Sequence, residues 1–570
     1  NGSIYLDWNV FKGFTAHVDY ALSFSNYFQK RADTPTGAAY DFQTGKDIGR
    51  YYVADNVGVS DNNTTNYKTQ LNGRLQYETT IAQNIGAMFV YSEEYWHTRS
   101  TGASRNDRIH PSTSEINSAL TNVQSNSGSS ASEGLRSYIG RMNYSAYDKY
   151  LLEFSFRVDG SSKFIKGHQY GFFPTVAVGW RFTEEEFLKK YLSSWLSSGK
   201  LRASWGKLGD NSGVGRFEQL ETLTAMNYMS SDVVKGFVNK KMINKDLSWE
   251  VSTDINVGLD LGFLNNRLRT EIDFYNRLRT GMNRPSQMSI HLTGAYSAPR
   301  ANIGDLLNRG LELNLTWKDK IGNVEYSVNL NGAYNRTVLK EWNEFLSRGW
   351  VYLDMPYHFL YVYENNGIAQ TWQDIYNNTP QGLSPGDVIR KDLNGDGIID
   401  GKDKKAYPNI QRDRPTTTYG ITLQAAWKGF DISMLFNGGL GRKDFWLTDF
   451  NNTAFADRRY ASTWDHWTEP WSLENRGGKW PRLGTSTDRS DNSYWLYNMN
   501  YLRMKNIMLG YNLPKKLLSK ISMTNLRIYA SAENLFTVTQ YPGLDPEKKN
   551  SARDLYPINR SFSIGLNVSF

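Results

Sequence analysis

The sequence predicts an all-β protein that crosses a membrane as an antiparallel transmembrane β-barrel. Three observations lead to this prediction. Apolar and polar residues alternate along many stretches, these stretches are about 9–17 residues long, and the connections between them are alternately short and long. The composition agrees with this prediction. Disordered chains contain few aromatic residues, whereas 14% of this chain is aromatic, and the sequence has no run of about 18 apolar residues that could form a membrane-spanning helix.

The alternation is clearest in the last expected strand, 560–570, where Phe562, Ile564 and Leu566 interleave with small polar residues. Successive side chains of a strand point to opposite faces, so one face of this strand is apolar and the other is polar. The stretch 247–263 repeats the pattern at greater length. Strands of soluble sandwiches have about 5–6 residues, whereas strands that cross a membrane have roughly 10, so the length favours a barrel.

Read backwards from the C-terminus, the chain contains 17 such strands. Their expected bounds are 3–10, 13–28, 66–80, 84–98, 134–145, 150–159, 172–182, 199–209, 247–263, 267–280, 307–317, 323–336, 415–427, 430–438, 499–511, 524–538 and 560–570.

The connections between these strands follow the parity of an outer-membrane barrel, which has short periplasmic turns and long extracellular loops. Short turns are expected near Phe11-Lys12, Ala82-Gln83, Tyr147-Asp148, Asn265-Asn266, Lys320-Ile321 and Lys428-Gly429. The extracellular loops are expected near 29–65, 99–133, 210–246, 281–306, 337–414, 439–498 and 539–559, and only the connection 160–171 is short among the outer ones. Two inner turns, 183–198 and 512–523, are longer and locally helical in sequence.

The strand count predicts that the barrel is incomplete in 1–570. Bacterial single-chain barrels have an even number of strands, and the first strand here would run towards the periplasm. We therefore expect an odd number of further strands before Asn1.

Charge and composition exclude several classes of function. The net charge of +8 is spread along the chain rather than clustered, so no nucleic-acid partner is expected. Without cysteine there is no disulfide framework, cysteine zinc site or thiol nucleophile, and the seven histidines never form an i, i+4 pair. A G-x-S-x-G elbow and a phosphate-binding loop are also missing from the sequence, so no enzymatic activity and no catalytic residue is expected. Charges expected on the polar face mix both signs and select no substrate charge: Arg157, Arg181, Arg202, Glu250, Asp254 and Arg269.

The segment 392–403 matches the spacing of an EF-hand calcium loop. Gly397 occupies the sixth position, where such loops turn sharply, and the twelfth position is Asp403 instead of the usual glutamate. The expected ligands are Asp392, Asn394, Asp396, the carbonyl of Ile398, Asp400 and Asp403. The alternative is a turn rich in Asp and Asn that binds no metal. If Ca²⁺ binds, we expect it to stiffen the loop rather than to take part in catalysis.

Aromatic residues fall into three groups. Candidates for substrate contact are Trp342, Trp350, Tyr352 and Tyr357. A second group invites a carbohydrate-stacking role but more often reflects packing within a loop: Trp464, Trp467, Trp471 and Trp480. A third group lies near strand ends and is typical of the aromatic girdle at a membrane surface: Trp8, Trp249, Trp317, Trp427 and Tyr511.

Several segments resemble one known family. They include FPTVAVGWR at 173–181, LRASWG at 201–206, NRGLEL at 308–313, YLRMKN at 501–506, AENLF at 532–536 and YPGLDP at 541–546. In this order they are similar to the SusC/RagA-type TonB-dependent transporters of Bacteroidota, densely over 130–570 and more loosely before. The resemblance implies a 22-stranded plugged barrel in the outer membrane, with about five strands, the plug and the TonB-contacting segment upstream of Asn1.

The resemblance also implies a function: TonB-driven import of oligosaccharides or oligopeptides. A SusD-like surface lipoprotein would close the extracellular face, and the barrel would contact the lipid bilayer and lipopolysaccharide. Two alternatives from other classes stay open, a passive porin or adhesin-like barrel and a secreted β-rich glycan-degrading enzyme. A plug-sized domain of about 100 residues would exclude the first, and solubility without detergent would favour the second.

Overall fold

The structure is a computed structural model of the whole chain. It describes residues 1–32, 36–41, 46–53, 58–81, 83–108, 113–120, 124–192, 195–229, 233–239, 241–289, 291, 298–344, 352–357, 359–412, 414–445, 469–482, 492–518, 523–548 and 558–569.

One sheet contains 17 of the strands, which confirms the all-β fold class and the expected number of long strands. They are β1 (Gly2–Phe11), β2 (Phe14–Ala32), β5 (Val59–Ile81), β6 (Gln83–Arg105), β7 (Gln124–Ala146), β8 (Tyr150–Ser161), β9 (Tyr170–Trp180), β10 (Leu196–Asp210), β13 (Glu250–Phe263), β14 (Leu268–Thr280), β17 (Asp305–Ile321), β18 (Val324–Glu341), β23 (Thr417–Trp427), β24 (Phe430–Leu440), β27 (Tyr501–Asn512), β28 (Asn525–Thr539) and β29 (Ser561–Ser569).

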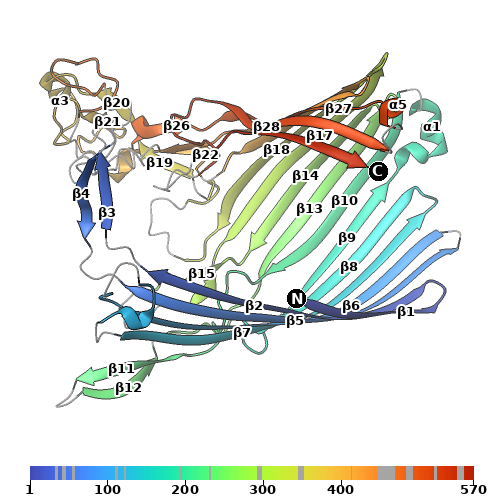
Figure 1. Cartoon of the computed structure of the whole chain (residues 1–570), viewed down its shortest axis with the longest axis horizontal. Coiled ribbons are helices and arrows are strands. Elements are labelled where there is room, and N and C mark those ends of the chain that lie inside the picture. The colour runs from blue at the N-terminus through green and yellow to red at the C-terminus, as the bar shows by residue number, and fades with distance from the viewer. Residues whose placement is uncertain are drawn as a thin grey trace. The chain divides into compact units, whose positions relative to one another are not determined.

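The chain divides into two compact units. In the first unit, strands β1, β2, β5, β6, β7 and β8 pair in that order, each antiparallel to the next (Figure 1). In the second unit, β14, β17, β18, β23, β24, β27, β28 and β29 pair in the same manner. Every strand in these two series is therefore a neighbour of the next long strand in the sequence, as in a meander.

The tight turns have the backbone conformation that right-twisted strands require. Tyr147 and Asp148 both have positive φ, 52° and 55°, and Lys149 N–H donates to the carbonyl of Ala146 at 3.0 Å. Lys428 and Gly429, with φ of 46° and 91°, connect the directly paired residues Trp427 and Phe430. Two-residue turns with positive φ match the twist of the strands that they join, so these turns fix the register of their hairpins.

The strand faces differ as the alternation predicts. On β17 and β18, Leu311, Leu313 and Leu315 pair with Tyr334, Gly332 and Leu330, so apolar side chains gather on one face of both strands. Leu311 is 48% exposed on that face. The opposite face of these two strands carries mainly Asn, Thr and Glu side chains, such as Glu312, Asn314 and Asn331. We call these surfaces the apolar face and the polar face of the sheet.

Several strands are longer than the sequence predicted. The expected bounds 66–80, 84–98 and 134–145 correspond to β5, β6 and β7, of 23 residues each. The added residues are rich in Ser, Thr, Asn and Gly and pair through their backbones, as at Thr64 with Ser100. The expected loops 29–65 and 99–133 are correspondingly shorter.

The long connections contain short antiparallel hairpins of their own. They pair β3 (Thr36–Asp41) with β4 (Lys46–Val53), β11 (Leu223–Met229) with β12 (Val233–Asn239), β15 (Asn283–Pro285) with β16 (Arg300–Asn302), β19 (Phe359–Tyr363) with β22 (Lys404–Gln411), β20 (Asn365–Ile368) with β21 (Val388–Arg390), and β25 (Lys443–Phe445) with β26 (Leu496–Asn498).

Both turns that looked helical in the sequence do contain helices. The first holds the short 3₁₀ helix η2 (Phe182–Glu184) and α1 (Glu186–Leu192), and the second holds α5 (Lys515–Leu518). Figure 1 shows α1 close to the beginning of β10. Among the described residues, no helix has both the length and the apolar character needed to cross a membrane.

Each unit has a small buried core outside the alternating strand faces. In the first unit, Phe164, Phe173, Val214, Leu247 and Trp249 pack together. The prediction that Trp249 belongs to the membrane-surface girdle is therefore wrong, because only 9% of this residue is exposed and its Nε1 donates to the carbonyl of Gln169 at 2.9 Å. In the second unit, the core consists of Leu360, Val362, Phe445, Trp480, Trp495, Met499 and Tyr541.

Candidate functional site on the polar face and its loops

The polar face of the second unit holds a three-residue ionic group on neighbouring strands. Arg202 on β10 places Nη2 2.7 Å from Asp260 Oδ1 and 2.9 Å from Asp273 Oδ2. The guanidinium also donates through Nε to Asp260 and through Nη1 to Asp273. Because the planar fork of arginine satisfies two carboxylates at once, this group orders three side chains on a surface that is still accessible to water.

Other charges of the polar face are paired in the same way. Arg277 lies 2.5 Å from Asp254, Arg157 lies 2.6 Å from Asp159, and Arg527 lies 2.5 Å from Asp431. Of the other charges expected there, Glu250 is buried and accepts a hydrogen bond from Asn283 N–H, whereas Arg181 and Arg269 are exposed. Partly exposed pairs of this kind contribute roughly 0–1 kcal/mol each. Their main effect is to present a mixed, hydrated surface without a dominant sign.

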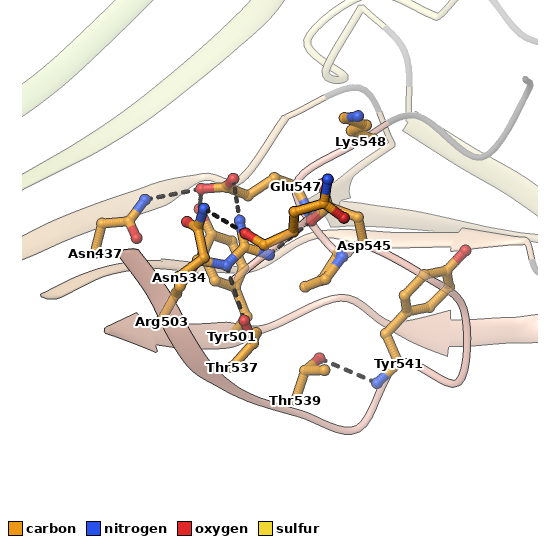
Figure 2. Close-up of polar contacts among 12 residues, drawn as sticks. Asn437, Tyr501, Arg503, Asn534, Thr537, Thr539, Tyr541, Asp545, Glu547 and Lys548 are labelled. Atoms are coloured by element: carbon orange, nitrogen blue, oxygen red, sulfur yellow. Dashed lines mark hydrogen bonds and ion pairs between the residues drawn. The ribbon is translucent and has the colours of Figure 1, made fainter. Parts of the chain in front are cut away.

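A second polar group is more deeply buried and lies at the ends of three adjacent strands. Asn437 on β24 is directly opposite Arg503 on β27, and Arg503 is directly opposite Thr537 on β28. All three side chains lie on the polar face, and the loop after β28 folds over them (Figure 2). Strand register alone thus brings together residues that are 34 and 66 positions apart in the sequence.

Arg503 links this strand group to two carboxylates of the loop. Its Nη2 lies 2.8 Å from Asp545 Oδ1, its Nη1 lies 2.5 Å from Glu547 Oε2, and its Nε donates to Thr537 Oγ1 at 2.8 Å. The side chains of Arg503 and Asp545 are 3% and 1% exposed, so this ion pair is buried. Figure 2 shows the guanidinium between the strand and the loop.

Glu547 receives three donors and stays ionised as a result. Asn437 Nδ2 and Tyr501 Oη each donate to its Oε1 at 2.8 Å, and Arg503 donates to its Oε2. Burial alone would raise the pKa of this carboxyl group, but the hydrogen bonds and the charge of Arg503 outweigh burial, so the pKa lies below its ordinary value of 4.5.

A second buried arginine holds the backbone of the same loop. Arg442 follows β24 and donates through Nη1 to the carbonyls of Pro546 and Glu547 and through Nη2 to the carbonyl of Lys548, each at 3.1 Å. Only 2% of Arg442 is exposed. We call Arg442, Arg503, Asp545 and Glu547 the arginine clamp. It fixes residues 545–548 against the strand ends through both side chains and backbone.

Two of the four tryptophans considered for carbohydrate stacking pack inside a loop. Trp471 and Trp480 are both buried, Trp471 Nε1 donates to Gln370 Oε1 at 2.9 Å, and the ring of Trp480 stacks on Trp495 with centroids 6.4 Å apart. The interpretation as loop-core packing is thus confirmed for these two residues. Trp464 and Trp467 lie outside the described residues.

The carboxylates of the expected calcium loop face backbone N–H groups of the loop itself. Asp392 accepts from Gly395 and Gly397, and Asp403, which is fully buried, accepts from Leu393 and Asp400. These N–H groups, with that of Asp400 first, lower the pKa of Asp403.

No group of three Asp, Glu, His or Cys side chains in the described part of the chain is close enough together to hold a metal ion. Ca²⁺ binding would require the loop oxygens to exchange N–H groups for the ion. The calcium site therefore stays a prediction.

The candidate substrate aromatics are only partly brought together. Tyr352 is 43% exposed and packs against Phe359 and Tyr361, with ring centroids 5.7 Å and 5.9 Å away. Trp342 and Tyr357 are half-buried, and Trp350 lies outside the described residues. The role of these residues in substrate contact stays a prediction.

Comparison with known protein families identifies the family to which this sheet belongs. The family model described as "TonB dependent receptor-like, beta-barrel" matches residues 2–385, which is about two thirds of the chain. The chain belongs to this family. Barrels of the TonB-dependent receptor family lie in the bacterial outer membrane, so the apolar face of the sheet meets lipid and the polar face lines the lumen.

Individual relatives agree with the SusC/RagA resemblance. TonB-dependent receptor P3 of Formosa agariphila is 28% identical over 97% of this chain and 59% of its own length. TonB-dependent receptor SusC of Bacteroides thetaiotaomicron is also 28% identical, over 98% of this chain and 56% of its own length. The chain thus spans a little more than half the length of these curated relatives.

Solved structures show the same fold. The structure titled "Structure of the RagAB peptide transporter" superimposes with a TM-score of 0.81 at 21% identity, over 100% of this chain and 61% of the matched chain. At this identity the likeness shows the fold, and the matched protein's cargo is its own.

The arginine clamp was missed by reasoning from residues, although YLRMKN and YPGLDP contain two of its members, Arg503 and Asp545, and were noted for their resemblance. The only local signal was a basic residue at a polar-face position of β27. Arg503 and Asp545 are 42 residues apart, and neither the bulge between Met504 and Asn506 nor the course of the loop could be predicted.

Proposed function

We propose that the protein imports nutrients across the outer membrane by the TonB-dependent route, with oligosaccharides or oligopeptides as cargo. The observation that carries the proposal is the family match on a sheet whose polar face is lined with paired charges. A hydrated surface of mixed sign suits neutral or zwitterionic oligomers, because it offers many hydrogen-bonding groups and repels neither charge. The proposed role is transport, without a catalytic step.

The proposed partners follow from the relatives. A SusD-like surface lipoprotein would close the extracellular mouth, as the SusC and RagAB matches suggest, and TonB would act through a plug-bearing part of the whole protein. The arginine clamp supports this arrangement, since a lid needs a defined rim to close on and the clamp orders residues 545–548. Lipopolysaccharide and lipid would contact the apolar face.

We also propose that loop 392–403 binds Ca²⁺. A second proposal is that Tyr352, which packs beside Phe359 and Tyr361, contacts the cargo. The support for calcium is the spacing of four carboxylates and one asparagine around two glycines of positive φ, 74° at Gly395 and 80° at Gly397. The support for cargo contact is the exposure of Tyr352 beside two further aromatic rings.

The test uses the whole protein in its native bacterium. Deletion of its gene should abolish growth on one class of oligomer, either oligosaccharides or oligopeptides, as the limiting nutrient, and inactivation of TonB should have the same effect. Binding of that oligomer by the purified whole complex, measured by calorimetry, separates transport from an indirect growth effect. Uptake that persists without TonB would refute the proposal and favour a passive porin.

A further inference from the structure

The connection between β9 and β10 contains a helix that exposes two aromatic rings. Phe187 and Tyr191 on α1 are four residues apart and therefore lie on one side of the helix. They are 63% and 75% exposed. The proposed transport function makes no use of them, and side chains of this size that are left bare in pairs are typical of a contact surface.

Both ends of this connection continue into the lipid-facing surface of the sheet. Trp180 ends β9 on the side of Phe172 and Val178, which are exposed on the apolar face. Its ring packs against Phe182 of η2 with centroids 5.9 Å apart, and the ring of Phe182 lies directly over Gly199 of β10.

At the other end, Trp195 stacks on Phe263 of β13 with centroids 5.9 Å apart. Leu264 N–H also donates to the carbonyl of Trp195 at 3.2 Å. The aromatic belt at the ends of β9, β10 and β13 is thus built partly from the connection itself. The exposed rings of α1 belong to the same short segment, between Phe182 and Trp195.

Basic residues accompany the exposed rings. Lys189 and Lys190 are in the last turn of α1, and Lys189 lies 3.7 Å from Glu184. Trp, Tyr and Lys are the residues that membrane proteins place at the level of the lipid headgroups, where a ring meets acyl chains and an ammonium group meets phosphate.

We propose that α1 is an interfacial anchor that rests on the phospholipid headgroups of the leaflet at the periplasmic ends of β9, β10 and β13. Phe187 and Tyr191 insert between the headgroups, and Lys189 and Lys190 remain at the level of the phosphates. Lipid is the occupant because both ends of the segment that bears these rings pack on a surface that faces lipid. The proposal depends on the outer-membrane location and not on the cargo or on TonB.

The test places single nitroxide labels on the whole protein in vesicles of phosphatidylethanolamine and phosphatidylglycerol. The 570 residues contain no cysteine, so F187C and Y191C can each be labelled uniquely within them, and K189C on the opposite side of the same helix is the matched control. We expect oxygen, which concentrates in the bilayer, to collide with the labels at 187 and 191 several-fold more often, relative to a water-soluble nickel chelate, than with the label at 189.

Two results would overturn the anchor. If the labels at 187 and 191 meet the nickel chelate as often as the label at 189, the rings are in water. If both labels are shielded from oxygen and nickel alike, the rings contact protein instead of lipid. Heat-modifiable migration of each variant on a gel confirms that the barrel is folded, and unchanged uptake of cargo shows that the result is separate from transport.

Discussion

Removal of Arg503 should release the loop that follows β28. In the R503M variant, methionine keeps much of the apolar stem but leaves the buried carboxylate of Asp545 without its cation and deprives Glu547 of one donor. Removing one partner of a buried ion pair costs about 3–5 kcal/mol, and each 1.36 kcal/mol is a factor of ten. We therefore expect the opening equilibrium of residues 545–548 to rise by about two to four powers of ten.

Hydrogen–deuterium exchange of peptides covering 539–548 measures this equilibrium. The N–H of Glu547, which donates to Asp545 Oδ1 at 3.0 Å, is the reporting amide. R527M is the matched control, because Arg527 pairs with Asp431 on the same face but at the other end of the strands, and it should leave these peptides unchanged. The double variant R503M/D545N should recover part of the protection, since it removes both buried charges. Unchanged exchange in R503M would refute the view that the arginine clamp holds the loop.

Three further predictions concern pH, packing and calcium. The pKa of Glu547 is lower in the folded loop than its ordinary value of 4.5, so its contribution to stability is complete above that value and is lost as the pH falls through the lower pKa of the folded loop. The protection of 539–548, corrected for the intrinsic exchange rate at each pH, should therefore fall at pH 4 relative to pH 7, and unchanged protection would contradict the assignment. A Cβ at Gly310 would collide with the ring of Tyr275, so G310A should lower the free energy of unfolding by about 1–3 kcal/mol, measured by thermal unfolding followed by fluorescence. G332A is the control, because its Cβ would meet only a backbone oxygen at 3.8 Å, and it should not lower stability. Equal effects of the two substitutions would show that the collision is irrelevant. Ca²⁺ should slow tryptic cleavage after Lys402. The D396N variant, which keeps a side-chain acceptor for Ile398 N–H but loses the charge, should abolish this effect. If Ca²⁺ does not change the cleavage rate of the parent protein, the site is excluded.

The local sequence predicted the structure correctly where a single interaction determines the conformation of a segment. Apolar and polar residues alternate in 250–263 and 561–569 because one side of each strand meets lipid. This requirement acts on every second residue, so it can be recognised in the sequence. The expected helix in 183–198 was likewise confirmed by α1. The extension of β6 to Arg105 was not foreseen, because backbone pairing beyond the membrane needs no apolar face and leaves no alternation to read.

The strands, their turns and their two faces could be predicted from the residues alone, since each depends on residues that are neighbours along the chain. The packing of Trp249 in a core with Phe164 and the ion pair of Arg503 with Asp545 could be found only in the folded chain. Both contacts join a strand end to a returning loop. The course of such a loop depends on which distant groups can satisfy its buried charges and carbonyls, and no local pattern specifies those partners.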